Sequence, residues 1–98
     1  MLTFEEIIDV IKAHESELKK FGMQKIGIFG SFVRGEATPE SDIDFLVVLE
    51  PKTFDNYMDL KFFLEDIFSR NVDLVLMDTI KPELRPYIEK EVVYATGI

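Results

Sequence analysis

The sequence contains no cysteine. This absence excludes a disulfide framework and a thiolate metal site, and it suits the reducing cytoplasm, where we expect the protein to act. Histidine is almost absent too. The one histidine, His14, lies along the apolar side of a predicted helix, which indicates a packing role rather than a catalytic one.

Long apolar runs and basic charge are also scarce. No run approaches the roughly 20 residues that a helix needs to span a bilayer, and the acidic N-terminus lacks the basic start of a signal peptide. Eleven Lys and Arg against 19 Asp and Glu give a net charge of −8. Since nucleic-acid binders neutralise phosphates with Lys and Arg, we expect neither direct nucleic-acid binding nor a membrane partner. A nucleotide carried with its metal ion, or a basic protein partner, fits this charge.

The chain has enough apolar material for one core. It has 98 residues, of which 47% are hydrophobic and nine are Phe. We therefore expect a single domain over residues 1–98.

Hydrophobic periodicity and capping signals predict the element order α-β-α-β-α-β-α. The predicted helices span about residues 3–20, 54–69 and 85–92, with one helical turn at 31–35, and the predicted strands span about 24–29, 43–49 and 72–77. Asn71 is the expected left-handed cap before the third strand. Residues 92–95 either finish the last helix or form a short edge strand.

This order predicts an α/β (α+β) fold with a small mixed sheet of three to four strands covered by helices. The second and third strands are expected to be parallel, because a long helix joins them. The first and second are expected to be antiparallel, because their connection is too short for a parallel crossover. The end of the first strand and the starts of the other two then meet at one edge of the sheet.

Candidate functional residues gather at that edge. Asp42 and Asp44 project from the same face of a strand, and two like charges this close call for a cation, such as a divalent metal with oxygen ligands. Gly30 lets backbone N–H groups approach a phosphate, and the hydroxyl of Ser31 adds a hydrogen bond. Asp73 begins the third strand. A phosphate cradle beside metal-binding acids indicates phosphoryl or nucleotidyl transfer.

A pattern of eight positions extends this site. It reads Gly30-Ser31-x-x-Arg34-Gly35, then Ser41-Asp42-x-Asp44, then an isolated Asp73. The pattern resembles that of the nucleotidyltransferase superfamily related to DNA polymerase β, and the short chain resembles the minimal nucleotidyltransferases of bacteria and archaea. The resemblance covers essentially the whole chain and implies the nucleotidyltransferase fold, which is like the polymerase β palm.

The resemblance also implies roles for these residues. Asp42 and Asp44 would hold two Mg²⁺ ions, for which Mn²⁺ can substitute. Asp73 would hold the metal that activates the acceptor hydroxyl and would serve as its base. Gly30 and Ser31 would hold the triphosphate of ATP or of another nucleoside triphosphate.

Four other positions are less decided. Arg34 either reaches a phosphate or braces the loop by pairing with an acid, and Ser41 either contacts the nucleotide or caps the strand entrance. Gly35 is expected to serve the turn. Asp78 is a rival of Asp73, but it lies at the far end of the third strand.

The minimal members of the family resemble the antitoxin of a pair whose other half is an all-helical HEPN ribonuclease toxin. The resemblance implies metal-dependent transfer of AMP from ATP to a toxin tyrosine. We expect no room for a second domain, so another protein or another copy of the chain would complete the acceptor pocket. Two alternatives are a catalytically silent antitoxin that acts by occlusion and nucleotidyl transfer to a small molecule such as an aminoglycoside.

Overall fold

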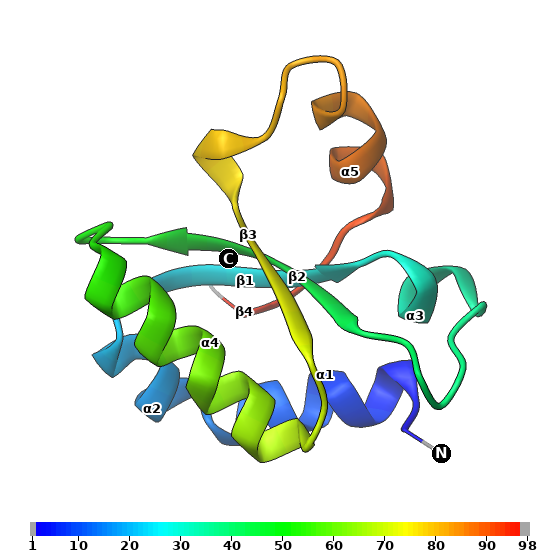
Figure 1. Ribbon diagram of the computed structural model, residues 1–98, viewed down its shortest axis with the longest axis horizontal. Helices are drawn as coiled ribbons and strands as arrows, with labels where there is room; N and C mark the ends of the chain where they lie inside the picture. Colours follow the sequence, from blue (N-terminus) through cyan, green and yellow to red (C-terminus); the bar gives the residue numbers. More distant parts are fainter. Residues whose placement is uncertain (1, 97–98) are drawn as a thin grey trace.

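The computed structural model describes residues 2–96 (Figure 1). In chain order the elements are α1 (Phe4–Ala13), α2 (Glu15–Lys20), β1 (Met23–Phe29), α3 (Ser31–Arg34), β2 (Ile43–Leu49), α4 (Phe54–Phe68), β3 (Val72–Leu76), the 3₁₀ helix η1 (Met77–Thr79), α5 (Arg85–Glu91) and β4 (Val93–Thr96).

The four strands form one mixed sheet in the order β3-β2-β1-β4. β1 is antiparallel to both β2 and β4, whereas β2 and β3 are parallel. The predicted α/β (α+β) fold and both predicted strand pairings are therefore confirmed. The segment 92–95, which the sequence left open, contributes to the edge strand β4.

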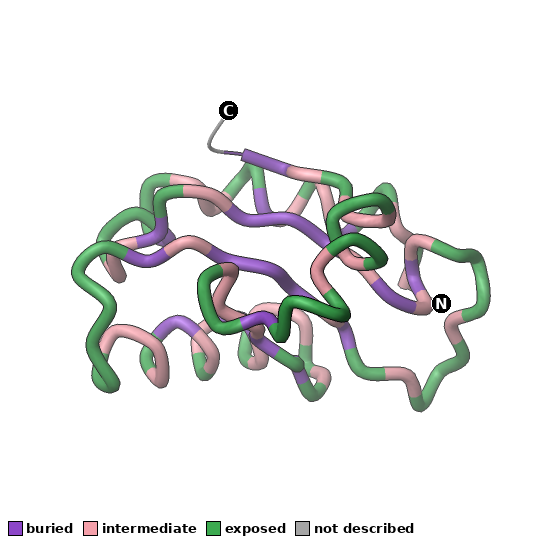
Figure 2. Tube along the Cα trace, turned by 90° about the horizontal axis from the view of Figure 1, so that it is seen from above, coloured by how far each residue is buried: buried purple, intermediate pink, exposed green. Residues whose placement is uncertain are grey.

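Helices cover the two faces of the sheet unequally. In Figure 1, α1, α2 and α4 lie together on one side of the sheet and α5 lies on the other. Phe45 and Val47 of β2 belong to the core, so Asp44 between the core positions Ile43 and Phe45 faces the side with α5. Figure 2 shows the buried positions following the central strands. None of the helices within residues 2–96 has the length and apolar character needed to cross a membrane.

The predicted helix over residues 3–20 is wrong, because it is broken at His14. Thr3 and Glu6 form the expected capping box of α1. His14 then leaves the helical conformation (φ −108°, ψ 16°), and its ring Nδ1 lies 2.8 Å from the Val10 carbonyl oxygen. That oxygen also accepts from the backbone N–H of His14, so side chain and main chain share one acceptor. The ring packs edge-on against Phe63 (5.9 Å between centroids), in the expected packing role.

The expected left-handed cap at Asn71 is also wrong. Ser69, with φ 50°, takes the left-handed conformation directly after α4. The helix continues as far as Phe68, whose ring packs against Phe45, and the chain must turn at once to enter β3. The third strand ends at Leu76 rather than Met77, because Met77 begins η1. α5 begins at Arg85, as predicted.

Gly27 allows β4 and the segment before it to lie against the middle of β1. A Cβ at this position would lie 2.7 Å from Val92 Cγ2 and 2.9 Å from Tyr94 Cδ1. Gly27→Ala is expected to lower the free energy of unfolding by about 1–3 kcal/mol through overpacking, as measured by urea denaturation. Gln24→Ala, at an exposed position of the same strand, is the control and should change little. Equal stabilities of the two variants would contradict this packing argument.

Candidate active site

Asp44 and Gly30 meet where β1 ends and β2 begins. Phe29, the last residue of β1, pairs with Asp44. Gly30 has φ 81°, and a Cβ on it would lie only 1.9 Å from Asp44 Oδ2. Both the backbone angle and this contact require glycine, so the structure gives a steric reason for glycine at the predicted phosphate-binding position.

Asp44 and Asp73 lie directly opposite each other in the parallel pairing of β2 and β3. Asp42, two residues before Asp44, precedes β2 and is exposed, as is Asp73. Burial first, and then the charges of Asp73 and Asp42, together raise the pKa of Asp44 to about 6, while the charge of Arg34 opposes them. The fold therefore brings three acids within electrostatic reach of one another.

The three carboxylates do not form a finished ligand cluster. Among residues 2–96, no three Asp, Glu or His side chains are gathered closely enough to enclose a metal ion. Mutual repulsion of like charges is a physical reason for such separation. The roles of Asp42, Asp44 and Asp73 as ligands remain a prediction.

The neighbouring loop is held by its own hydrogen bonds. The Ser41 hydroxyl accepts from the Thr38 N–H (2.8 Å), and the Ser41 carbonyl accepts from Arg70 Nη1 (2.9 Å). Gly35 is the left-handed cap of α3 (φ 73°), and a Cβ there would meet nothing within 4 Å. Ser41 and Gly35 thus shape the loop, and Ser31 lies half-buried at the start of α3.

Arg34 pairs with acids in this structure, which is one of the two arrangements that the sequence left open. Its Nε lies 2.8 Å from Glu36 Oε1, and its Nη1 lies 3.1 Å from each carboxylate oxygen of Glu91. Both acids raise the pKa of Arg34, through the hydrogen bond to Glu36 first and then that to Glu91. Glu91 also accepts a hydrogen bond from the backbone N–H of Gly30.

Sequence reasoning missed Glu91. It lies 61 residues after Gly30, and the chain carries it there only because β4 pairs with β1. No local motif surrounds Glu91, and the one available signal was the pairing of residues 92–95, which the sequence left undecided.

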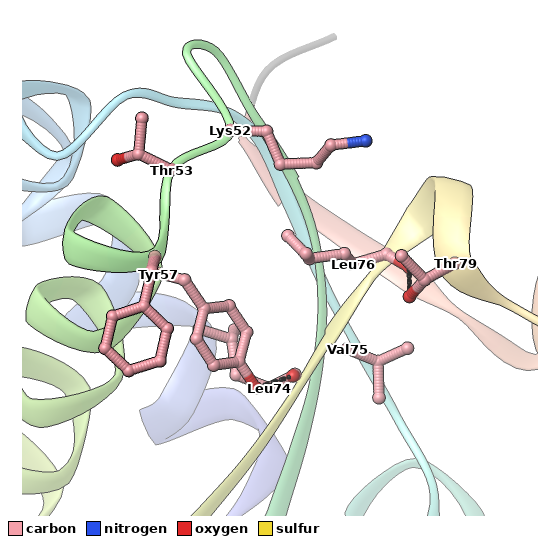
Figure 3. Close-up of a pocket in the computed structure, with 8 residues that line it drawn as sticks. Lys52, Thr53, Tyr57, Leu74, Val75, Leu76 and Thr79 are labelled. Carbon is pink, nitrogen blue, oxygen red and sulfur yellow. Dashed lines mark hydrogen bonds between the residues drawn. The ribbon is translucent and has the colours of Figure 1, made fainter.

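A pocket of about 330 Å³ adjoins these groups. Its lining comes from the end of β1, α3, β2 and α5, and consists of Phe29, Gly30, Arg34, Asp44, Tyr87, Ile88 and Glu91. A second hollow of about 470 Å³ lies along β3 at its other end, where Tyr57 donates to the Leu74 carbonyl oxygen (2.6 Å; Figure 3). This second hollow has no acidic lining residue. Asp78 is near that end as well, paired with Lys52, and is not part of the site.

Comparison with known proteins assigns the family. A profile of the nucleotidyltransferase domain matches residues 10–95. The chain belongs to this family. Protein adenylyltransferase MntA of Thermococcus cleftensis is 42% identical over 96 residues, which cover 96% of this chain and 97% of that protein. The chain is thus a nucleotidyltransferase.

Solved structures agree with this assignment. A minimal nucleotidyltransferase superposes with a TM-score of 0.81 at 31% identity, covering 94% of this chain and 95% of that one. A chain from the complex of the tri-AMPylated Shewanella oneidensis HEPN toxin with MNT antitoxin superposes with a TM-score of 0.66 at 19% identity, covering 93% and 73%. At that identity the likeness concerns the fold alone. The resemblance inferred from the sequence is confirmed.

The raised pKa of Asp44 predicts a pH-dependent stability. A folded-state pKa of about 6, above the usual 3.8, favours the protonated carboxyl, so its stabilising effect is complete below about pH 4 and is lost as the pH rises through 6. Asp44→Asn is therefore expected to raise the free energy of unfolding near pH 8 by about 1 kcal/mol, allowing for partial exposure. Urea denaturation in EDTA measures the difference, which should vanish below about pH 4.

The control is Asp59→Asn, at an exposed position of α4. It removes one negative charge without touching the site, so it isolates the effect of overall charge. A less stable Asp44→Asn variant near neutral pH would instead identify Asp44 as a structural carboxylate.

Proposed function

We propose that this chain transfers AMP from ATP to a hydroxyl of a partner protein in a metal-dependent reaction, and that it serves as the antitoxin of a HEPN-type helical toxin. The observation that carries the proposal is the placement of Asp44, partly buried against Gly30 and in register with Asp73. The 42% identity to a protein adenylyltransferase supports the AMP group and the protein acceptor. The likeness in fold to a chain of a HEPN–MNT complex supports the class of partner.

The acids fit a divalent cation by their chemistry. Asp42, Asp44 and Asp73 offer only carboxylate oxygens, which are the ligands that Mg²⁺ and Mn²⁺ prefer. Burial first, and then the charges of Asp73 and Asp42, raise the pKa of Asp44, and these crowded negative charges are what a cation neutralises. In the proposed site Asp42 and Asp44 would hold two ions, and Asp73 would hold one of them. When bound, the ions neutralise charge on the attacking and leaving oxygens of an in-line displacement.

The chain's own groups bind the substrates and move the proton. The backbone at Gly30 and the hydroxyl of Ser31 bind the triphosphate. Asp73 accepts the proton of the acceptor hydroxyl as its oxygen bonds to the α-phosphorus. The bond from that phosphorus to the oxygen bridging the α- and β-phosphates breaks, and pyrophosphate leaves with the electron pair.

The surface beside the pocket suits a protein acceptor. On α5 and just before it, Tyr87 is 75% exposed and Leu84 is 49% exposed, although both are large apolar side chains. Tyr87 also lines the pocket next to Asp44, so a partner seated on α5 would reach the reacting groups. The net charge of −8 favours a basic partner surface. A cytoplasmic location, where ATP is supplied, is part of this proposal.

Loss of one proposed metal ligand should abolish transfer without unfolding the chain. We expect Asp44→Asn and Asp73→Asn each to lower the rate of AMP transfer by at least about 100-fold. Asp44→Asn removes a proposed metal ligand, and Asp73→Asn removes both a proposed ligand and the group that accepts the proton of the acceptor hydroxyl. The assay follows label from α-labelled ATP into the proposed HEPN-type helical partner, with Mg²⁺ present.

Asp78→Asn is the matched control, because Asp78 is an exposed aspartate close behind the same strand but at its other end. It should transfer AMP at the rate of the unsubstituted chain. Transfer that survives Asp73→Asn would remove this residue from the reaction. Toxin neutralisation that survives Asp44→Asn would favour the silent antitoxin that acts by occlusion.

Transfer is also expected to depend on the partner. The pocket is open on the side of Tyr87, and orientation of the acceptor can account for several kcal/mol of a barrier. The chain alone should therefore hydrolyse or transfer nucleotide at a rate at least about tenfold lower than the rate at which it labels the partner when the partner is present. Rapid transfer by the chain alone to a free aminoglycoside would overturn the protein acceptor and favour small-molecule modification.

A further inference from the structure

Glu91, the last residue of α5, reaches across the pocket to the end of β1. Its carboxylate accepts a hydrogen bond from the Gly30 N–H and lies 3.1 Å, through each oxygen, from Arg34 Nη1. The Glu91 side chain keeps only 25% of its surface exposed, against 49% for Arg34. Glu91 is thus the anion held by this backbone N–H and this guanidinium.

The same donors suit a phosphate group. Carboxylate and phosphate oxygens both accept charge-assisted hydrogen bonds from guanidinium and backbone N–H groups. Gly30, Arg34 and Glu91 line one pocket with Asp44, so the Glu91 carboxylate lies in the space beside the proposed reacting acids. A triphosphate bound at Gly30 would need the N–H that Glu91 now occupies.

Repulsion from the nearby acids works against this position of Glu91. Its charge contributes to raising the pKa of Asp44, and Glu36 shares Arg34 with it. The Arg34 guanidinium therefore pairs with two carboxylates and lies within electrostatic reach of a third, that of Asp44. An incoming phosphate and Glu91 cannot both be accommodated there without further repulsion, so their occupancy should be mutually exclusive.

We propose that Glu91 holds the place of a phosphate group in the nucleotide-free chain, and that nucleotide binding displaces its carboxylate from Gly30 and Arg34. The proposal rests on the proposed function, because it takes the nucleotide to bind at Gly30. Displacement breaks contacts that fasten the end of α5 to β1 and α3. Since α5 carries Tyr87 and Ile88 of the same pocket, nucleotide binding changes the helix that would meet the acceptor.

Binding of tripolyphosphate and of ATP, each with Mg²⁺, tests the exchange. Isothermal titration should show that Glu91→Gln binds both ligands about three- to tenfold more tightly than the unsubstituted chain, because no competing anion has to leave. In hydrogen exchange, tripolyphosphate should speed exchange of the α5 amides in the unsubstituted chain. In Glu91→Gln these amides should exchange fast already and respond little.

Glu89→Gln is the matched control, because Glu89 lies on the same helix, pairs with Arg85 (3.1 Å) and does not contact Gly30 or Arg34. Its affinity for both ligands should equal that of the unsubstituted chain. If Glu91→Gln fails to fold, Glu91→Asp, whose shorter side chain weakens the same contacts, replaces it and should also bind more tightly.

The outcomes separate this inference from the proposed function. Weaker binding by Glu91→Gln would overturn the exchange and make Glu91 a ligand of the bound nucleotide or its metal. Equal affinities of Glu91→Gln and the unsubstituted chain would overturn the exchange and leave Glu91 with a structural role alone, as a contact between α5 and β1, while the proposed function stands. Absence of ATP binding in every protein, including the unsubstituted chain, would contradict both.

Discussion

The close contact between the Asp44 carboxylate and the backbone of Gly30 fixes the geometry on which the candidate site depends. The contact exists because β1 and β2 are antiparallel and pair Phe29 with Asp44. A side chain at position 30 would occupy the space of the Asp44 carboxylate, so this position requires glycine, which here has a positive φ. The parallel pairing of β2 with β3 then sets Asp73 beside Asp44. Two different strand pairings are thus needed to assemble one acidic edge.

The fold tolerates this acidic edge because its core lies on the opposite face of the sheet. Alternate residues of β2 point toward α1, α2 and α4, where Phe45 and Val47 are fully buried. Asp44, between core positions, faces the side that carries only α5, and its raised pKa records the cost of holding a charge there. Most of the packed core lies on the face that carries α1, α2 and α4, although Leu46, on the same face of β2 as Asp44, is also fully buried. A charge change at the acidic edge therefore leaves this main core in place.

Local spacing explains what the sequence could reveal. Gly30, Asp42 and Asp44 lie within one short stretch, and the topology needed to add Asp73 followed from the length of each connection. The break at His14 was hidden because hydrophobic periodicity does not report a change of backbone angles at one residue, here one whose ring Nδ1 and backbone N–H both lie against the Val10 carbonyl oxygen. Glu91 was hidden for a different reason. Its place is set by a pairing between β1 and β4, across 61 residues, and short edge strands leave little local signal.

The two arrangements that the sequence allowed for Arg34 need not be rival descriptions. Its guanidinium now holds Glu36 and Glu91, which is the bracing arrangement. The phosphate arrangement uses the same fork of donors, and one fork cannot serve two anions fully at the same time. If a phosphate takes the place of Glu91, Arg34 changes partner while keeping an anion, and the Gly30 N–H does the same. The contacts that hold α5 and the contacts that bind nucleotide would then be alternative states of one set of donors. The position of α5, the helix facing the acceptor, would therefore depend on whether nucleotide is bound.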